Sequence, residues 1–261
     1  MRLLFLLGIP LFLLAGCHSS GSSSSTGEWE PLFNGENLDG WDIKFTGQAP
    51  GVNYKNTFRV EDGLLKVRYD QYDSLNNVFG HLITKERYSH YKIRAEYRFV
   101  GEQIPGGADW AYKNNGMIIH SQSAGSMRKN QEFPVGVEVQ LLGGDEEHER
   151  TNLNVCTPGT FVKVDGEYID EHCYNSSLDA PHGDQWVTVT VEVLGDSVIK
   201  HIIDDEVVLR YEDPILDEQS PDYEKLVSSE TGKRLTEGHI ALQAESHPTD
   251  FREVEIMVLE E

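Results

Sequence analysis

The sequence predicts an all-β fold of two packed antiparallel sheets, and three observations support this prediction. Short runs alternate apolar with polar side chains, which is the period of a half-buried strand. Dipeptides typical of tight hairpin turns, such as Asp62-Gly63 and Gly195-Asp196, separate several of these runs. Apolar residues do not recur with a helical period over any long stretch, and only residues 221–229 are candidates for a short helix.

Individual strands can be placed from this alternation. In residues 91–99 apolar side chains stand at every second position, and residues 187–193 alternate valine with threonine and glutamate. A turn at Asp62-Gly63 divides residues 57–69 into two further runs. This pattern fits a jelly-roll or lectin-like sandwich better than a barrel, and no long repeat indicates a propeller. Such sandwiches commonly curve, so that one sheet has a concave, solvated face.

The N-terminal residues 1–17 combine one arginine, a long apolar run and the ending Leu14-Ala15-Gly16-Cys17. This pattern indicates a secretory signal and not a membrane span, because the apolar run is too short. The ending resembles a bacterial lipobox, in which Cys17 is lipidated and becomes the mature N-terminus. An ordinary signal peptide followed by a free cysteine is the alternative. We therefore expect export and attachment to the cell envelope by lipid alone, in the periplasm or at the cell surface.

Residues 18–27 are rich in serine and glycine and are predicted to form a flexible tether. No second low-complexity segment interrupts residues 28–261, which we interpret as a single catalytic domain. The chain has 22 basic and 44 acidic residues, for a formal net charge of −22. A surface of this sign repels phosphate backbones, so nucleic acid is not an expected partner.

Two cysteines, Cys156 and Cys173, remain once Cys17 is set aside. In an oxidising compartment an even pair favours a disulfide, which would stabilise the fold by about 3 kcal/mol in the chain-entropy model. Metal binding is the alternative, because His172 adjoins Cys173. The spacing lacks the close CxxC pattern of zinc sites, so the sequence favours the disulfide.

Three predicted strands, in residues 116–122, 135–142 and 239–247, direct apolar side chains to one face and polar ones to the other. The polar side chains are His120, Gln122, Glu138, Gln140, Gln243, Glu245 and His247. Solvated faces usually carry Lys, Thr and Ser, whereas clustered titratable groups are typical of functional sites. We expect these side chains to meet in one hollow on the concave face.

Glu138 lies between Val137 and Val139, so its strand is predicted to be central in a sheet. Retaining jelly-roll glycosidases carry paired carboxylates on one strand as Glu-x-Asp-x-x-Glu or a close variant. Here Gln140 occupies the aspartate position and Gly143 the position of the second glutamate. Ordinary double displacement from this strand is therefore not expected.

Five segments resemble the 3-keto-disaccharide hydrolase domain family, in the same order, from about residue 28 to the C-terminus. They are LFNGENLDGW (32–41), NNGMIIHSQ (114–122), VGVEVQLLGG (135–144), GDQWVTVTVEV (183–193) and GHIALQAESHPTDFREVEI (238–256). The resemblance implies a concanavalin A-like jelly roll in exported proteins of glycan-degrading bacteria. It also implies cleavage of glycosides oxidised to a ketone at C3, by hydrolysis or elimination. Metal dependence occurs in the family, so the cofactor is left open and a divalent metal is possible.

A C3 ketone acidifies the C2 hydrogen, so a base can remove it and the enolate can expel the group at C1. This chemistry needs one base and a group that stabilises the enolate oxygen. We assign His120 or Glu138 as the base, and Glu245 with His247 as the acid or metal-holding pair. The side chains expected to position the sugar are Gln122, Gln140, Gln243, Arg252 and Trp110.

A non-catalytic carbohydrate-binding surface lipoprotein of the same fold is the alternative function. In that protein Trp110 and Tyr112 would form a flat platform for a sugar ring. Convergence of His120, Glu138 and Glu245 around one pocket would favour the enzyme. The identity of the sugar and its linkage are left open by the sequence.

Overall fold

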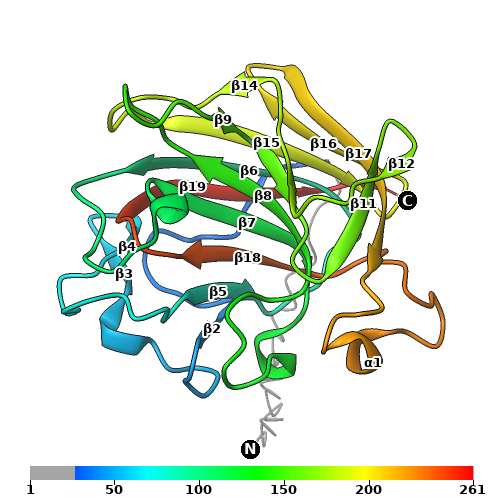
Figure 1. The fold of residues 1–261 in the computed structure, drawn as a ribbon, viewed down its shortest axis with the longest axis horizontal. Coiled ribbons are helices and arrows are strands. Elements are labelled where there is room, and N and C mark those ends of the chain that lie inside the picture. Colours follow the sequence, from blue (N-terminus) through cyan, green and yellow to red (C-terminus); the bar gives the residue numbers. More distant parts are fainter. Residues whose placement is uncertain (1–26, 261) are drawn as a thin grey trace, which may run out of the picture.

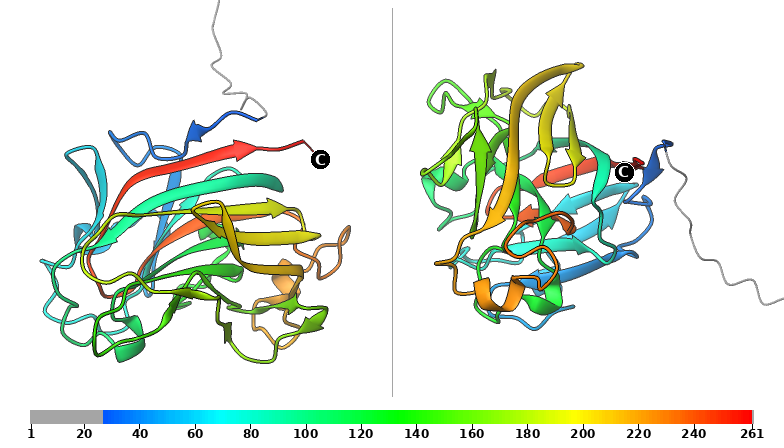
Figure 2. Two further views of the ribbon diagram at one scale, coloured as in Figure 1. Left: turned by 90° about the horizontal axis from the view of Figure 1, so that it is seen from above. Right: turned by 90° about the vertical axis from the view of Figure 1, so that its right-hand side faces the viewer.

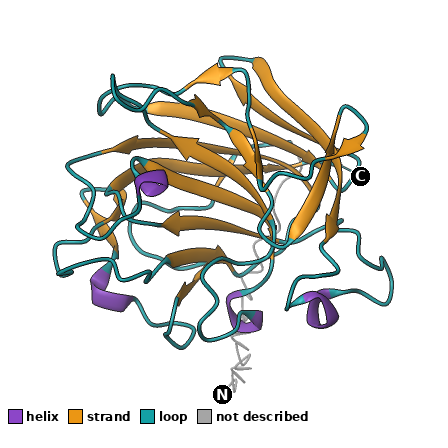
Figure 3. Ribbon diagram, in the orientation of Figure 1, coloured by secondary structure: helices purple, strands orange, loops and turns teal. Residues whose placement is uncertain are grey.

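The structure, a computed structural model, describes residues 27–260 and confirms the predicted all-β sandwich (Figure 1). Two antiparallel sheets pack face to face, as Figure 2 shows from two further sides. The helices among these residues are short and lie in the connections between strands (Figure 3). Within residues 27–260, no helix is long and apolar enough to cross a membrane. The expected signal segment 1–17, the lipidated Cys17 and nearly all of the tether lie outside the described residues.

The seven-stranded sheet carries the polar strands that the sequence singled out. In spatial order its strands are β13 (Cys173–Tyr174), β10 (Asn154–Cys156), β8 (Val137–Leu142), β7 (Asn114–Ser121), β18 (His239–Ala244), β5 (Gly80–Thr84) and β2 (Trp41–Phe45). Strands β8, β7 and β18 are therefore adjacent, although β18 lies far along the chain from the other two.

The second large sheet has ten strands among the described residues. Its spatial order is β12 (Glu167–Tyr168), β11 (Thr160–Val164), β17 (Glu206–Leu216), β16 (Val198–Ile203), β15 (Val187–Leu194), β6 (His90–Phe99), β19 (Thr249–Val258), β4 (Leu64–Val67) and β3 (Phe58–Glu61), with β1 (Glu30–Pro31) also paired to β19. Strands β14 (Leu178–Asp179) and β9 (Thr151–Asn152) form a small third sheet. The helices are α1 (Tyr223–Leu226), which lies in the stretch expected to be helical, and the 3-10 turns η1 (Tyr54–Asn56), η2 (Asp109–Ala111) and η3 (Ala124–Ser126).

The main core lies between the two large sheets. Val137 and Val139 of β8 and Leu242 of β18 are fully buried in it, together with Ile93 and Val191 from the opposite sheet. Burying each such side chain stabilises the fold by about 1.5–3 kcal/mol. Because side chains alternate along a strand, this burial directs Glu138 and Gln140 to the outer face of the seven-stranded sheet.

One end of that outer face is apolar and covered. Ile83, Ile118 and Ala241 lie there on neighbouring strands and pack against Ala124 and Met127, which belong to the segment that follows β7. This small cluster is separate from the main core. Polar side chains on the outer face therefore gather toward the other end.

The regular alternation of β7 ends at a bulge. Ser121 pairs with His239 and Ile118 with Ala241, so two residues of β7 lie opposite one residue of β18. His120, in the bulge, has a left-handed backbone with φ of 48°. Its imidazole Nε2 donates to the carbonyl oxygen of Gly195 at 3.1 Å, in the turn between β15 and β16 of the other sheet. The expectation that His120 points the same way as Glu138 is therefore wrong.

We predict that Gly238→Ala destabilises the protein. A Cβ at Gly238 would lie 2.4 Å from the carbonyl carbon of His120, where backbone cannot move aside cheaply. Such overpacking costs about 1–3 kcal/mol. Urea unfolding at pH 7 measures the loss, with Gly125→Ala as the control because a Cβ there meets nothing within 4 Å. Equal stability of the two variants would contradict this account of the bulge.

Candidate active site

The register of β8 with its neighbours places Glu138 and Gln140 near the middle of the outer face. Glu138 pairs with Ile118 of β7 on one side and with Cys156 of β10 on the other. Gln140 pairs in the same way with Gly116 and Asn154. Asn154 donates from Nδ2 to Gln140 Oε1 at 3.0 Å. β8 is thus central, as its flanking valines predict.

A pocket of about 340 Å³ opens over this part of the sheet. Its lining combines two carboxyl groups, two amides, aromatic rings and a disulfide. The lining residues are Trp110, Asn114, Phe133, Glu138, Gln140, Cys156, Pro158, His172, Cys173 and Glu245. Four of the site candidates that the sequence indicated therefore meet in one pocket. They are Trp110, Glu138, Gln140 and Glu245. The disulfide between Cys156 and Cys173, which the cysteine count favoured, is part of its wall.

Gly116 allows polar side chains from two strands to approach each other across β7. A Cβ at this position would lie 2.4 Å from Oε1 of Gln243 and 2.8 Å from Oε1 of Glu138. The space that a side chain of β7 would fill is therefore occupied by the ends of these two residues. Any larger residue at position 116 would force them apart.

Burial shifts the protonation of both carboxyl groups. Loss of hydration raises the pKa of Glu138 to about 7, although the nearby amide of Gln243 favours the charged form. Burial raises the pKa of Glu245 well above its ordinary value, and the neighbouring carboxylate of Glu138 adds to the shift. Near neutral pH the pair of carboxyl groups therefore retains a proton.

Several buried polar atoms at this end of the sheet have no hydrogen-bond partner within residues 27–260. They are Oε2 of Glu245, Oδ1 of Asn114, both amide atoms of Gln243 and both ring nitrogens of His81. Buried polar atoms are nearly always hydrogen-bonded, so such a cluster is a place where a ligand or water supplies the missing partners. A polyhydroxylated molecule matches this mixture of donors and acceptors.

His81 is a site candidate that the sequence did not indicate. It lies on β5 opposite Gln243 of β18 and is 1% exposed. Its ring meets that of Phe133 edge to face, with centroids 5.7 Å apart. Burial, with a smaller contribution from nearby Lys44, lowers the pKa of His81 to about 3, so the imidazole is neutral. The whole of β5 is buried, and its sequence shows no polar alternation that would have marked this residue.

The residues of the pocket do not fit the divalent metal expected as a possibility. No group of three or more His, Cys, Asp or Glu side chains between residues 27 and 260 is arranged to hold a metal ion.

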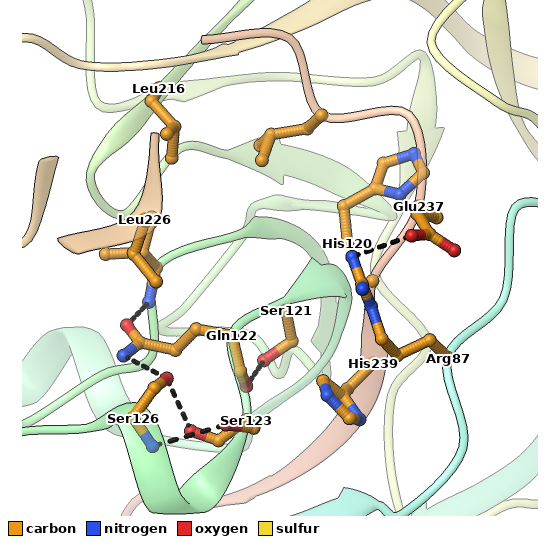
Figure 4. Close-up of a pocket in the computed structure, with 13 residues that line it drawn as sticks. Arg87, His120, Ser121, Gln122, Ser123, Ser126, Leu216, Leu226, Glu237 and His239 are labelled. Carbon is orange, nitrogen blue, oxygen red and sulfur yellow. Dashed lines mark hydrogen bonds and ion pairs between the residues drawn. The ribbon is translucent and has the colours of Figure 1, made fainter. Parts of the chain in front are cut away.

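His120 and Gln122 lie apart from this pocket. They line a second pocket of about 250 Å³, shown in Figure 4, together with the Arg87–Glu237 ion pair. Gln122 donates to Ser126 Oγ at 3.0 Å, and its amide oxygen accepts from the backbone of Val135 at 2.7 Å. Gln122 therefore braces the segment that follows β7. The expectation that it lies beside Glu138 is wrong, because the bulge at His120 ends the alternation.

His247 is also directed away from Glu138. β18 ends at Ala244, so the parity of the strand does not extend to position 247. The imidazole packs edge to face against Phe99 and Tyr112, with centroids 5.6 and 5.4 Å away. Tyr112 in turn stacks on His148. The expected His247–Glu245 couple and the Trp110–Tyr112 platform therefore do not form at the pocket.

Arg252 belongs to the other sheet. It lies on β19, forms an ion pair with Glu96 and packs over the ring of Trp186 at 4.6 Å. Strand β19 pairs with β6 and β4 and is not part of the sheet that carries Glu138. The expectation that Arg252 lies with the sugar-positioning groups is therefore wrong.

Comparison with known proteins places this geometry in context. A provisionally assigned glycosyl hydrolase from Parabacteroides distasonis ATCC 8503 is similar, with a TM-score of 0.51 and 20% identity over 90% of this chain and 94% of that one. A Bacillus subtilis protein of unknown function with a galectin-like fold gives a TM-score of 0.53 and 13% identity over 91% and 99%. These likenesses establish the fold alone. No protein with a curated description matches. The family model described as "3-keto-alpha-glucoside-1,2-lyase-like domain" matches residues 28–257.

The raised pKa of Glu138 predicts a specific dependence of stability on pH. Between its ordinary value of 4.5 and about 7, the folded protein keeps a proton that the unfolded chain releases. Rising pH therefore favours the unfolded state, by as much as about 3 kcal/mol across this interval. Glu138→Gln removes this contribution, so its free energy of unfolding should fall less than that of the wild type over the same interval.

Denaturant unfolding at a series of pH values measures the difference. Glu206→Gln, the same change at an exposed position of β17, serves as the control and should follow the wild type. Parallel curves for the wild type and Glu138→Gln would show that Glu138 is not a perturbed acid.

Proposed function

The chain belongs to the 3-keto-α-glucoside-1,2-lyase-like domain family, and we propose that it cleaves 3-keto-glycosides by removing the proton at C2. Family membership confirms the resemblance seen in the sequence and indicates a glycosyl-hydrolase-like or carbohydrate-binding jelly roll. The observation that carries the proposal is the pair Glu138 and Glu245, two buried carboxyl groups at one pocket, both with raised pKa values.

Glu138 is the base in this proposal. A carboxylate with a pKa of about 7 is ionised to a useful extent at neutral pH and is a stronger base than an ordinary glutamate. It takes the C2 proton of the sugar, and the electron pair of the C2–H bond forms an enolate with the C3 carbonyl. The ketone is essential to this step, because an unoxidised sugar has no comparably acidic hydrogen at C2.

Glu245 stabilises the enolate. Held protonated by burial, it donates a hydrogen bond to the C3 oxygen as negative charge develops there. The C3 carbonyl then reforms, a C1–C2 double bond forms, and the bond between C1 and the leaving oxygen breaks. That oxygen takes the proton back from Glu138, which restores the base. Addition of water across the double bond converts this elimination into net hydrolysis.

Other polar groups, in the pocket and beside it, bind the sugar. The unpartnered atoms of Asn114, Gln243 and His81 match the hydroxyl groups of a ring that lies over β7 and β18. Trp110 is 52% exposed and lines the pocket, so its face is available for stacking on that ring. These contacts support a carbohydrate as the ligand.

A carbohydrate-binding protein without catalysis is the second candidate, and the exposed Trp110 favours it. Both candidates predict sugar binding, and turnover separates them. We also propose export, with lipid attachment through Cys17 at the cell envelope, on the pattern of residues 1–17.

We predict that the protein releases nitrophenol from a 3-keto aryl glucoside and not from the unoxidised aryl glucoside. Glu138→Gln should lose nearly all of this activity, because an amide cannot accept the proton. The exposed control Glu206→Gln should retain it. A substrate deuterated at C2 should react more slowly, with a primary isotope effect on kcat/KM, if C2–H cleavage limits the rate.

Two results would overturn the proposal. One is release from neither substrate, which would favour the binding protein if calorimetry still detects the sugars. The other is equal activity of Glu138→Gln and the wild type.

The two carboxyl groups also predict a bell-shaped dependence of kcat/KM on pH. Activity should rise about tenfold per pH unit below about 7, as Glu138 ionises. It should fall again in more alkaline solution, where Glu245 loses the proton that it donates. In Glu245→Gln the amide still donates but does not ionise, so the alkaline decline should disappear while some activity remains. An unchanged alkaline limb in this variant would exclude Glu245 as the donor.

A further inference from the structure

The disulfide holds a short segment of chain against the pocket. Cys156 lies on β10 directly opposite Glu138, and it is joined to Cys173 on β13. Strand β13 has only two residues and is the edge strand of the sheet. Its register with β10 consists of the pair Val155–Tyr174 and the disulfide-bonded pair itself. The covalent link therefore supplies much of the attachment of this edge strand.

The same attachment positions His172, the residue before Cys173. The backbone nitrogen and the hydroxyl group of Thr157 both donate to the carbonyl oxygen of His172, at 2.9 and 3.3 Å. Thr157 directly follows Cys156, so the disulfide and these hydrogen bonds hold neighbouring points of the same segment. The side chain of His172 lines the pocket, as do Pro158 and both cysteines.

The strand order separates the pocket into two sides. Glu138 and Gln140 lie on β8, with β7 and β18 on one side and β10 and β13 on the other. On the β7 and β18 side are the polar atoms that lack partners, with Trp110 close by through its hydrogen bond to Asn114. On the β10 and β13 side are the disulfide, Pro158 and His172. One side is equipped for a sugar ring, and the other offers one hydrogen-bonding side chain, that of His172, beside Pro158 and the disulfide.

We propose that the disulfide-bonded wall is the leaving-group subsite and that His172 is the residue that contacts the leaving group. The proposal rests on the proposed function, since it takes Glu138 as the base beneath C2. The 3-keto sugar lies over β7 and β18, and the group attached at C1 extends toward β10 and β13. His172 then determines which leaving groups are accepted, and the disulfide holds His172 in position.

The test compares two substrates that share one sugar. A methyl 3-keto-glucoside has a leaving group too small to reach His172, and a 3-keto-disaccharide has one with hydroxyl groups. His172→Ala should lower kcat/KM for the disaccharide about tenfold, the effect of one lost hydrogen bond, and leave the methyl glycoside unchanged. His182→Ala, an exposed histidine outside the pocket lining, is the matched control and should change neither.

The disulfide is tested in the same comparison. Cys156→Ser with Cys173→Ser should also reduce activity selectively on the disaccharide, because His172 loses its fixed position. Adding His172→Ala to that double variant should have a smaller effect than in the wild type, since both changes remove one interaction. Retained turnover of the methyl glycoside shows that the variant is folded.

A binding measurement keeps this proposal separate from the proposed function. Calorimetry on Glu138→Gln compares the affinities for the two 3-keto substrates with and without His172→Ala. Selective weakening for the disaccharide supports the subsite even if the wild type turns over neither substrate, a result that would overturn the proposed function alone. Equal losses for both ligands, or no loss for either, would overturn the leaving-group subsite.

Discussion

The burial of two carboxyl groups on one face of a sheet is the constraint on which the rest of this site depends. Glu138 and Glu245 are 6% and 2% exposed, and loss of hydration disfavours the charged form of each. Because each carboxylate also disfavours ionisation of the other, the pair keeps a proton at neutral pH. In the proposed mechanism these two chemically identical side chains have different roles, one as an acceptor of protons and one as a donor of a hydrogen bond.

The sandwich makes this burial possible. On the inner side of the same strands, Val137, Val139 and Ala244 are fully buried in the main core, which fixes the backbone that carries the carboxyl groups. On the outer side the chain covers the sheet unevenly. The cluster around Ile118 and Met127 covers one end, and the pocket that contains Glu138 and Glu245 opens toward the other. Strand β8 thus positions Glu138, and the bend directly after β18 positions Glu245.

The alternation of side chains along strands is a local property, and it predicted the direction of side chains correctly where the strands are regular. Glu138 and Gln140 on β8 lie on the expected face, and Glu245 reaches the same pocket from the end of β18. It failed at His120, where one extra residue in β7 reverses the direction of the side chain. It also failed at His247, which lies beyond the end of its strand. Whether a bulge forms depends on the partner strand, and here Gly238 lies close to the backbone of His120. The residue pattern of β7 alone does not contain that information.

The amino-acid sequence by itself determined the all-β class, the family, the favoured pairing of the two cysteines and the polar character of the central strands. These follow from residue type and spacing, which are local. The tertiary structure alone decided that His81 joins the polar cluster, that Arg252 lies on the other sheet and that the disulfide forms a wall beside Glu138. It also decided that Glu138 and Glu245 are buried at the same pocket. Those outcomes depend on which strands become neighbours and how deeply each group is buried, and both are set by contacts between residues far apart in the chain.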